Sequence, residues 1–105
     1  MKLNFSLTQL EYVLAVNKYG HFAKAAEACA ITQPTLSMQI QKLEEDLGVV
    51  LFDRSKKPIL LTEAGQRVMD QIQSILFEAK KLETLVQSAQ DDKTHGSLIL
   101  GVIPT

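Results

Sequence analysis

The 105-residue sequence has a single cysteine, Cys29, and no long apolar run. One thiol excludes an internal disulfide and leaves too few ligands for a structural zinc site. His21 and His95 have no companion ligands, so we expect neither a metal nor another cofactor. Because no segment has the length and apolarity of a signal peptide or a membrane span, we expect a cytoplasmic protein that does not enter the membrane.

The sequence also lacks the residue sets that enzymes use. It contains no Ser/His/Asp set at plausible positions, no glycine-rich phosphate loop and no pair of carboxylates evidently held in a pocket. We therefore do not expect an enzyme. The length allows one small domain and an extension, but not two full cores.

A strong excess of charge of either sign is missing, because the formal net charge is −1. This value argues against a protein that binds any nucleic acid indiscriminately. The charges are unevenly distributed: residues 1–62 hold seven basic and six acidic side chains, whereas residues 63–105 hold four and six. Any affinity for DNA must therefore come from individually placed groups in the first part of the chain.

Two helices are predicted within the first 30 residues. Ser6 and Gln9 have the spacing of a capping box, and Gly20 ends the first helix. The apolar stripe of this helix consists of Leu7, Leu10, Val13 and Leu14. A shorter helix at about residues 22–29 has a face of mostly small residues, namely Phe22, Ala25, Ala26 and Cys29. Small residues let another helix cross closely, which favours a helix-turn-helix.

A third helix is predicted after the N-cap candidate Thr32, with Pro34 in its first turn and Gly48 at its end. Its core stripe consists of Leu36, Ile40, Leu43 and Leu47. The opposite face is uncharged in its first two turns, whereas the end of the helix carries three carboxylates, those of Glu44, Glu45 and Asp46. A phosphate backbone would repel these carboxylates, so we expect only the first two turns to enter a major groove.

The uncharged face of this helix carries groups that can read base edges. Amides pair with adenine, hydroxyls bond to bases or phosphates, and methyl or thioether groups contact the thymine methyl. The candidates for base readout are Gln33, Pro34, Thr35, Ser37, Met38 and Gln41. Taken alone, such a surface is equally compatible with an ordinary solvated helix.

Short β-prone runs at residues 49–52 and 59–62 flank a basic segment and predict a small hairpin. Such a hairpin can lie along the DNA backbone as a wing, or place an arginine in a narrow minor groove. The alternative is a hairpin kept soluble by its charge. The candidates for contacts with phosphates, in the hairpin and elsewhere, are Lys24, Thr32, Lys42, Arg54, Lys56 and Lys57.

A long fourth helix is predicted from Glu63 to about residue 91, with Thr62 as its cap. Apolar residues recur along it at alternating spacings of four and three, the heptad pattern of paired helices. This heptad seam consists of Val68, Ile72, Ile75, Ala79, Leu82, Val86 and Ala89. No other part of so small a domain is expected to cover the seam, so we predict a homodimer. The alternative is packing against a further domain.

The predicted fold class is mainly α: a winged helix-turn-helix, with three helices and a β-hairpin wing, followed by a long dimerisation helix. We divide the chain into a DNA-binding domain at residues 1–62, a linker and dimerisation helix at 63–91, and a segment at 92–105. The last segment contains an apolar run at residues 97–103 that has no partner strand in this sequence. We interpret it as a hinge and the first strand of a truncated regulatory domain.

Several stretches resemble the LysR family of bacterial transcriptional regulators. The most specific is the run Gln33-Pro34-Thr35-Leu36-Ser37-Met38-Gln39-Ile40, and residues 10–12, 20–26, 43–49, 51–54 and 61–65 continue the resemblance over nearly the whole chain. The resemblance implies regulation of transcription from interrupted inverted repeats in double-stranded operator DNA. It also implies a dimer through the fourth helix, a tetramer when the regulatory domain is present, and RNA polymerase as a further partner.

Residues 33–37 and 101–105 are most similar to the peroxide-sensing branch of this family. That similarity implies control of the oxidative stress response by a protein whose redox cysteines lie in the regulatory domain, so this chain would bind DNA without sensing peroxide. Many members have Ser where this chain has His21, which changes the helix cap and the phosphate contact expected there. Two alternatives remain: a LysR-type regulator that responds to a small-molecule effector, and a coiled-coil protein-interaction module.

Overall fold

The computed structural model describes the backbone of residues 3–92. The elements follow in the order α1 (Leu7–Tyr19), α2 (Phe22–Ala28), α3 (Gln33–Leu47), β1 (Phe52–Asp53), β2 (Leu60–Leu61) and α4 (Glu63–Asp92). The two strands pair antiparallel, with Phe52 opposite Leu61. The mainly helical fold predicted from the sequence, with three helices, a hairpin and a long helix, is confirmed. The strand predicted at residues 97–103 lies outside the described residues.

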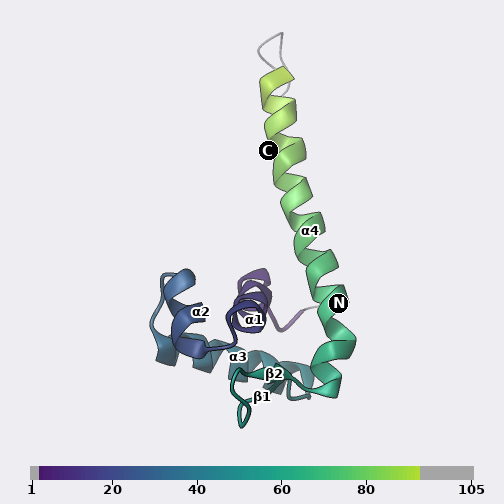
Figure 1. The fold of residues 1–105 in the computed structure, drawn as a ribbon. Helices are drawn as coiled ribbons and strands as arrows, with labels where there is room; N and C mark the ends of the chain where they lie inside the picture. Colours follow the sequence, from purple (N-terminus) through teal and green to yellow (C-terminus); the bar gives the residue numbers. More distant parts are fainter. Residues whose placement is uncertain (1–2, 93–105) are drawn as a thin grey trace.

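The three short helices and the hairpin form a body from which α4 projects (Figure 1). This projection makes the molecule elongated, with extents of 57 × 31 × 21 Å. Within residues 3–92, no helix is both long and apolar enough to cross a membrane.

The predicted caps form at the starts of α1 and α3. At α1 the Ser6 hydroxyl accepts from the Gln9 N–H at 3.2 Å, and Gln9 Oε1 accepts from the Ser6 N–H at 2.9 Å. At α3 the Thr32 hydroxyl accepts from the Thr35 N–H at 3.3 Å. Each bond satisfies a backbone donor that the helix itself leaves without a partner, so the chain enters both helices where the sequence predicts.

One apolar core joins the helices, the hairpin and the start of α4. Its buried members are Leu10, Val13, Val16, Phe22, Ala25, Ala26, Leu36, Ile40, Leu43, Leu51, Phe52, Met69 and Ile72. Two residues that the sequence assigns to core stripes are exposed instead, Leu7 at 48% and Leu47 at 37%. Leu7 is the first residue of α1 and Leu47 the last of α3, so both lie where the neighbouring elements no longer cover the helix.

The hairpin is shorter than the two β-prone runs predict. Only Phe52–Asp53 and Leu60–Leu61 are paired, while Val49 and Val50 are exposed. The segment before β1 instead turns around the end of α3, where the Leu51 N–H donates to the side chain of Glu44 at 2.7 Å. Contact with α3 therefore replaces strand pairing there.

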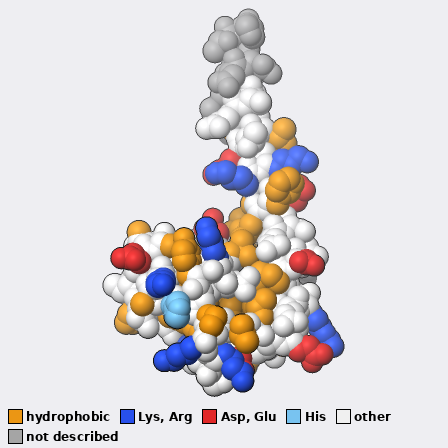
Figure 2. All heavy atoms as spheres, viewed as in Figure 1, with side chains coloured by type: hydrophobic (Ala, Val, Ile, Leu, Met, Phe, Trp, Pro, Cys, Tyr) orange, Lys and Arg blue, Asp and Glu red, His pale blue; other side chains and the backbone are white. Residues whose placement is uncertain are grey.

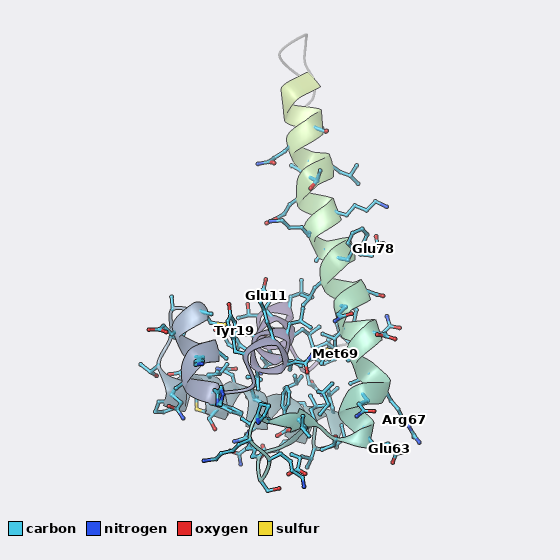
Figure 3. The ribbon with its side chains drawn as sticks, in the orientation of Figure 1. Glu11, Tyr19, Glu63, Arg67, Met69 and Glu78 are labelled. Carbon is cyan, nitrogen blue, oxygen red and sulfur yellow. The ribbon has the colours of Figure 1, made fainter. Side chains whose placement is uncertain are left out.

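The heptad seam predicted along α4 is divided between two environments. Ile72 is buried, and Val68 and Ile75 pack against the core of the same chain; Figure 3 shows the neighbouring Met69 on the side of α4 that faces α1. Farther along, Leu82 and Val86 are 64% and 48% exposed. The expectation that nothing in the domain could cover the seam is thus wrong for its first part, because α4 itself closes the core there.

Two glycines end helices in the left-handed conformation, Gly20 with φ of 72° and Gly48 with φ of 77°. Gly20 also contacts the base of the hairpin, where its carbonyl accepts from the Ile59 N–H at 2.9 Å. A Cβ added at Gly20 would lie 2.7 Å from the Cβ of Pro58, whereas a Cβ added at Gly48 would meet nothing within 4 Å. Gly20 therefore both ends α1 and lets the hairpin approach.

We expect Gly20→Ala to lower the free energy of unfolding more than its matched control, Gly48→Ala. Both substitutions force a side chain into the left-handed region, at about 1–2 kcal/mol. Only at residue 20 does the new methyl group overlap Pro58, which adds about 1–3 kcal/mol of overpacking. Urea unfolding of both variants measures the difference, and equal losses would contradict the close packing of the hairpin on this turn.

Candidate nucleic-acid interface

The face of α3 that points away from the core is open to solvent. Met38 is 57% exposed, and the helix has no acidic residue in its first turn. Gln33, Pro34, Met38 and Gln41 are exposed, while Thr35 and Ser37 are partly buried at its two edges. We call these six residues the reading surface: Gln33, Pro34, Thr35, Ser37, Met38 and Gln41. Lys42, also exposed, follows at its end.

The two threonines at the start of α3 have different hydrogen-bonding capacity. The Thr32 hydroxyl accepts from the Thr35 N–H and donates to Thr35 Oγ1 at 2.8 Å. Its only hydrogen is thus used within the protein, whereas the Thr35 hydroxyl keeps its own hydrogen for an outside acceptor. Of the two, Thr35 is the better donor to a phosphate or a base.

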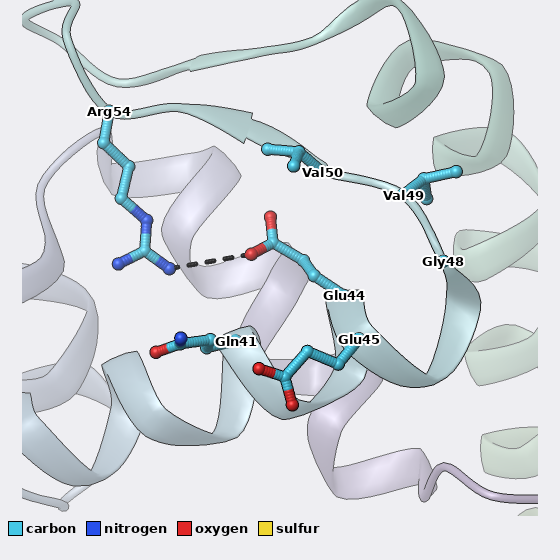
Figure 4. Close-up of a pocket in the computed structure, with 7 residues that line it drawn as sticks. All are labelled: Gln41, Glu44, Glu45, Gly48, Val49, Val50 and Arg54. Carbon is cyan, nitrogen blue, oxygen red and sulfur yellow. Dashed lines mark ion pairs between the residues drawn. The ribbon is translucent and has the colours of Figure 1, made fainter.

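Arg54 folds back from the hairpin onto two helices. Its Nη1 donates to the Ser37 hydroxyl at 3.0 Å, and its Nη2 lies 3.8 Å from Glu44 Oε1 (Figure 4). The guanidinium also lies 4.5 Å from the centroid of the Phe22 ring, a cation–π contact with α2. In this conformation Arg54 braces the hairpin against α2 and α3, and placing it in a minor groove would require the release of these contacts.

Glu44 has a different role from the one predicted from the sequence. Its side chain is only 11% exposed, and its Oε2 accepts from the Leu51 and Phe52 N–H groups at 2.7 and 3.4 Å. The carboxylate therefore holds the segment before β1 on α3 and does not face a phosphate backbone. The prediction of repulsion is wrong for Glu44, whereas Glu45 and Asp46 are exposed.

A partly buried amide pair that the sequence analysis missed connects α1 with α3. Gln9 is 5% exposed, and its Nε2 donates to Gln39 Oε1 at 3.1 Å while its Oε1 caps α1. An amide can accept at the cap and donate elsewhere, whereas a glutamate in the same capping box could only accept. The one indication in the sequence was the choice of Gln and not Glu at residue 9, and this choice did not identify Gln39 as its hydrogen-bond partner.

The hairpin turn is held by Asp53 and presents two lysines. The Asp53 carboxylate accepts from the Ser55 hydroxyl and from the Ser55 N–H at 3.0 Å. These hydrogen bonds lower the pKa of Asp53, and the charge of Lys56 adds to the effect. The ionised carboxylate thus holds the turn, while Lys56 and Lys57 are exposed beside it.

Cys29 is partly buried after the end of α2. Burial raises the pKa of its thiol, and the nearby Glu11 carboxylate raises it further. A raised pKa keeps the thiol protonated at neutral pH and thus a poor nucleophile. Among the residues that the structure describes, no group of three or more His, Cys, Asp or Glu side chains could hold a metal ion.

We expect Glu44→Ala to lower the free energy of unfolding by about 1–3 kcal/mol, because it leaves backbone N–H groups without their acceptor. The matched control is Glu45→Ala, an exposed neighbour whose loss should change stability by no more than about 0.5 kcal/mol. Urea unfolding of both variants measures this difference. Similar values for the two would show that the Glu44 carboxylate does not hold the hairpin.

Comparison with known proteins places this arrangement in a family. Residues 7–66 match the family model described as bacterial regulatory helix-turn-helix protein, lysR family. Over 100 residues the chain is 41% identical to the hydrogen peroxide-inducible genes activator of Haemophilus influenzae, an alignment that covers 95% of this chain and 33% of that protein. The chain thus spans about a third of the length of the curated relatives it matches.

Solved structures agree with the sequence match. A full-length OxyR variant from Pseudomonas aeruginosa is 40% identical, with a TM-score of 0.76 over 81% of this chain and 29% of that one. The DNA-binding domain of BenM, solved in complex with benA site 1 DNA, is 33% identical, with a TM-score of 0.76 over 80% of this chain and 94% of that one. The family comprises transcription regulators and not enzymes. The chain belongs to the LysR family of bacterial regulators and forms its helix-turn-helix DNA-binding domain.

Proposed function

We propose that this chain is the operator-reading part of a peroxide-responsive LysR-type regulator and acts on the chromosome in the cytoplasm as a homodimer. The observation that carries the proposal is the exposed, uncharged reading surface of α3 beside a basic hairpin. The relatives named for peroxide induction and for OxyR support the peroxide response. The sensing of peroxide, the tetramer and the contact with RNA polymerase belong to the longer protein.

In this proposal the first two turns of α3 enter the major groove. The reading surface then meets base edges, with Gln33 and Gln41 pairing by their amides and Met38 touching thymine methyl groups. The exposed Glu45 and Asp46 keep the far end of the helix away from phosphates. The phosphate contacts come from Lys24, Thr35, Lys42, Lys56 and Lys57, with Thr32 acting mainly as the cap.

Dimerisation is proposed through the part of α4 that projects from the body. Val68, Ile72 and Ile75 serve the core of their own chain, so the seam available to a partner consists of Ala79, Leu82, Val86 and Ala89. Leu85, 59% exposed, adjoins it. An isolated helical segment of about 12–15 residues is only marginally stable in water, so a second copy that covers these residues would stabilise the projection. The proposed division keeps a DNA-binding domain at residues 1–62, a linker and dimerisation helix at 63–91 and a final segment at 92–105, with the start of α4 also completing the core of the first domain.

Gln33→Ala is expected to relax base preference at one operator position by about 1–3 kcal/mol, because it removes one amide that pairs with a base edge. Lys57→Ala, the matched control, removes a phosphate contact and should weaken binding to operator and scrambled duplexes alike. Fluorescence anisotropy titrations with both duplexes measure the two effects.

An unchanged operator preference in Gln33→Ala would contradict its assignment to base readout. Absence of DNA binding by the unmodified chain even at low salt, where phosphate contacts are strongest, would favour the protein-interaction module instead.

Leu82→Asp is expected to shift the monomer–dimer equilibrium at least tenfold towards monomer, because a charge inside an apolar seam loses about 1.4 kcal/mol or more of association free energy. Thr84→Asp adds the same charge to an exposed position on the other side of α4 and serves as the control. Analytical ultracentrifugation measures both equilibria. Equal dissociation of the two variants, or none, would contradict the proposed seam.

A further inference from the structure

A pair of side-chain amides joins α1 to α3, the helix that carries the reading surface. Gln9 of α1 is the only buried polar side chain in the part of the chain that the structure describes, at 5% exposed. Its Nε2 donates to Gln39 Oε1 at 3.1 Å, and its Oε1 accepts from the Ser6 N–H at 2.9 Å. A buried amide lowers stability unless its hydrogen bonds are made, so both ends of this side chain are held in place.

Apolar packing attaches α3 to the body. Leu36, Ile40 and Leu43 are fully buried, and Figure 2 shows apolar side chains gathered where α4 meets the body, with charged side chains around the edge of the body. Apolar burial depends on the area removed from water and has no preferred direction, whereas a hydrogen bond weakens steeply as its angle changes. The polar contacts of α3 therefore define its rotation about its own axis more sharply than the apolar contacts do.

These polar contacts lie on both sides of the apolar stripe of α3. Gln39 directly precedes a residue of the stripe, whereas Ser37 and Glu44 each directly follow one, so the helix places them on opposite flanks. The first flank is attached to α1 through Gln9. The second is attached to the hairpin, because Arg54 bonds to Ser37 at 3.0 Å and lies 3.8 Å from Glu44. Without the amide pair, polar contacts would hold α3 on one flank only.

We propose that the hydrogen bond between Gln9 and Gln39 sets the rotational position of the reading surface and thereby determines how well the chain discriminates between bases. In this role both amides are positioning residues, and neither contacts a base. The proposal rests on the proposed function, because it concerns the surface that meets the base edges. Groups at the surface of an α-helix lie about 5 Å from its axis, so a rotation of about 20° displaces them by about 2 Å. A direct hydrogen bond to a base edge does not survive such a displacement.

Contacts with phosphates are less sensitive to the rotation of α3. Lys56 and Lys57 belong to the hairpin and do not turn with the helix, and an ammonium group on a flexible stem attracts a phosphate over several ångströms. Loss of the amide pair should therefore reduce discrimination between bases more than affinity for DNA of any sequence. A general loss of stability has a different effect, because a smaller folded fraction weakens binding to every duplex by the same factor.

The test compares binding to one duplex with binding to its single-base-pair variants. The probe is a duplex that the unmodified chain selects from a random-sequence library, and each base pair of one half-site is substituted in turn. Gln9→Met/Gln39→Met replaces both amides by apolar groups of similar size, which leaves no unpaired donor within the pair. The largest discrimination ratios, about 5- to 150-fold for a good pair of base contacts, should fall at least about threefold in this variant. Affinity for a scrambled duplex should stay within about twofold.

Two control variants separate positioning from stability and charge. Ser6→Ala removes a hydroxyl from the same capping box but retains the hydrogen bond between Gln9 and Gln39, so it should lower stability and leave the discrimination ratios unchanged. Gln39→Glu retains an acceptor for Gln9 Nε2. Its added negative charge should weaken binding to all duplexes and leave their ratios unchanged. Fluorescence anisotropy gives the ratios, and urea unfolding gives the stability of each variant.

Gln39→Met alone leaves the capping box intact and is the second test of the same pair. It should lose discrimination to the same extent as the double variant. Unchanged ratios in both amide variants, or an equal loss in Ser6→Ala or in Gln39→Glu, would overturn the positioning role while leaving the proposed function intact. Failure of the unmodified chain to select any duplex would overturn the proposed function, and the positioning role with it.

Discussion

The carboxylate of Glu44 is the contact on which the position of the hairpin relative to α3 depends. It accepts from two backbone N–H groups in the segment before β1, and Arg54 approaches it from the hairpin. The same guanidinium bonds to Ser37 and stacks on Phe22. One ion pair with its hydrogen bonds thus aligns the surface proposed to read bases with the hairpin proposed to contact phosphates. The pairing of two-residue strands alone would leave the position of the hairpin poorly fixed.

This brace also explains how a chain of net charge −1 can present a surface suited to DNA. Glu44 is turned inward against Arg54, the ionised Asp53 carboxylate is held by Ser55 beside Lys56, and the first turn of α3 carries no acidic residue. The exposed cations of the hairpin then act at short range, where screening by salt is weakest. Local placement of charge, and not an overall basic field, is what the fold provides for a polyanionic partner.

The parts of the fold that were predictable are those that depend on neighbours in sequence. A capping box at Ser6, an N-cap at Thr32 and the helix ends at Gly20 and Gly48 each involve residues within one helical turn, and all appear as expected. The exposure of Leu7 and Leu47 was not predictable. A periodic apolar pattern indicates which side of a helix is apolar, but it does not indicate how far the neighbouring elements extend along that side.

The sequence by itself determined the order and type of the elements, the apolar faces of the helices and the candidate reading surface, because periodicity and capping are local properties. Only the tertiary structure decided that Glu44 is a support and not a repulsive charge, that Arg54 bends back, and that the heptad seam of α4 divides between the chain's own core and solvent. Each of these outcomes depends on which groups from distant segments meet, and no spacing within a single helix contains that information.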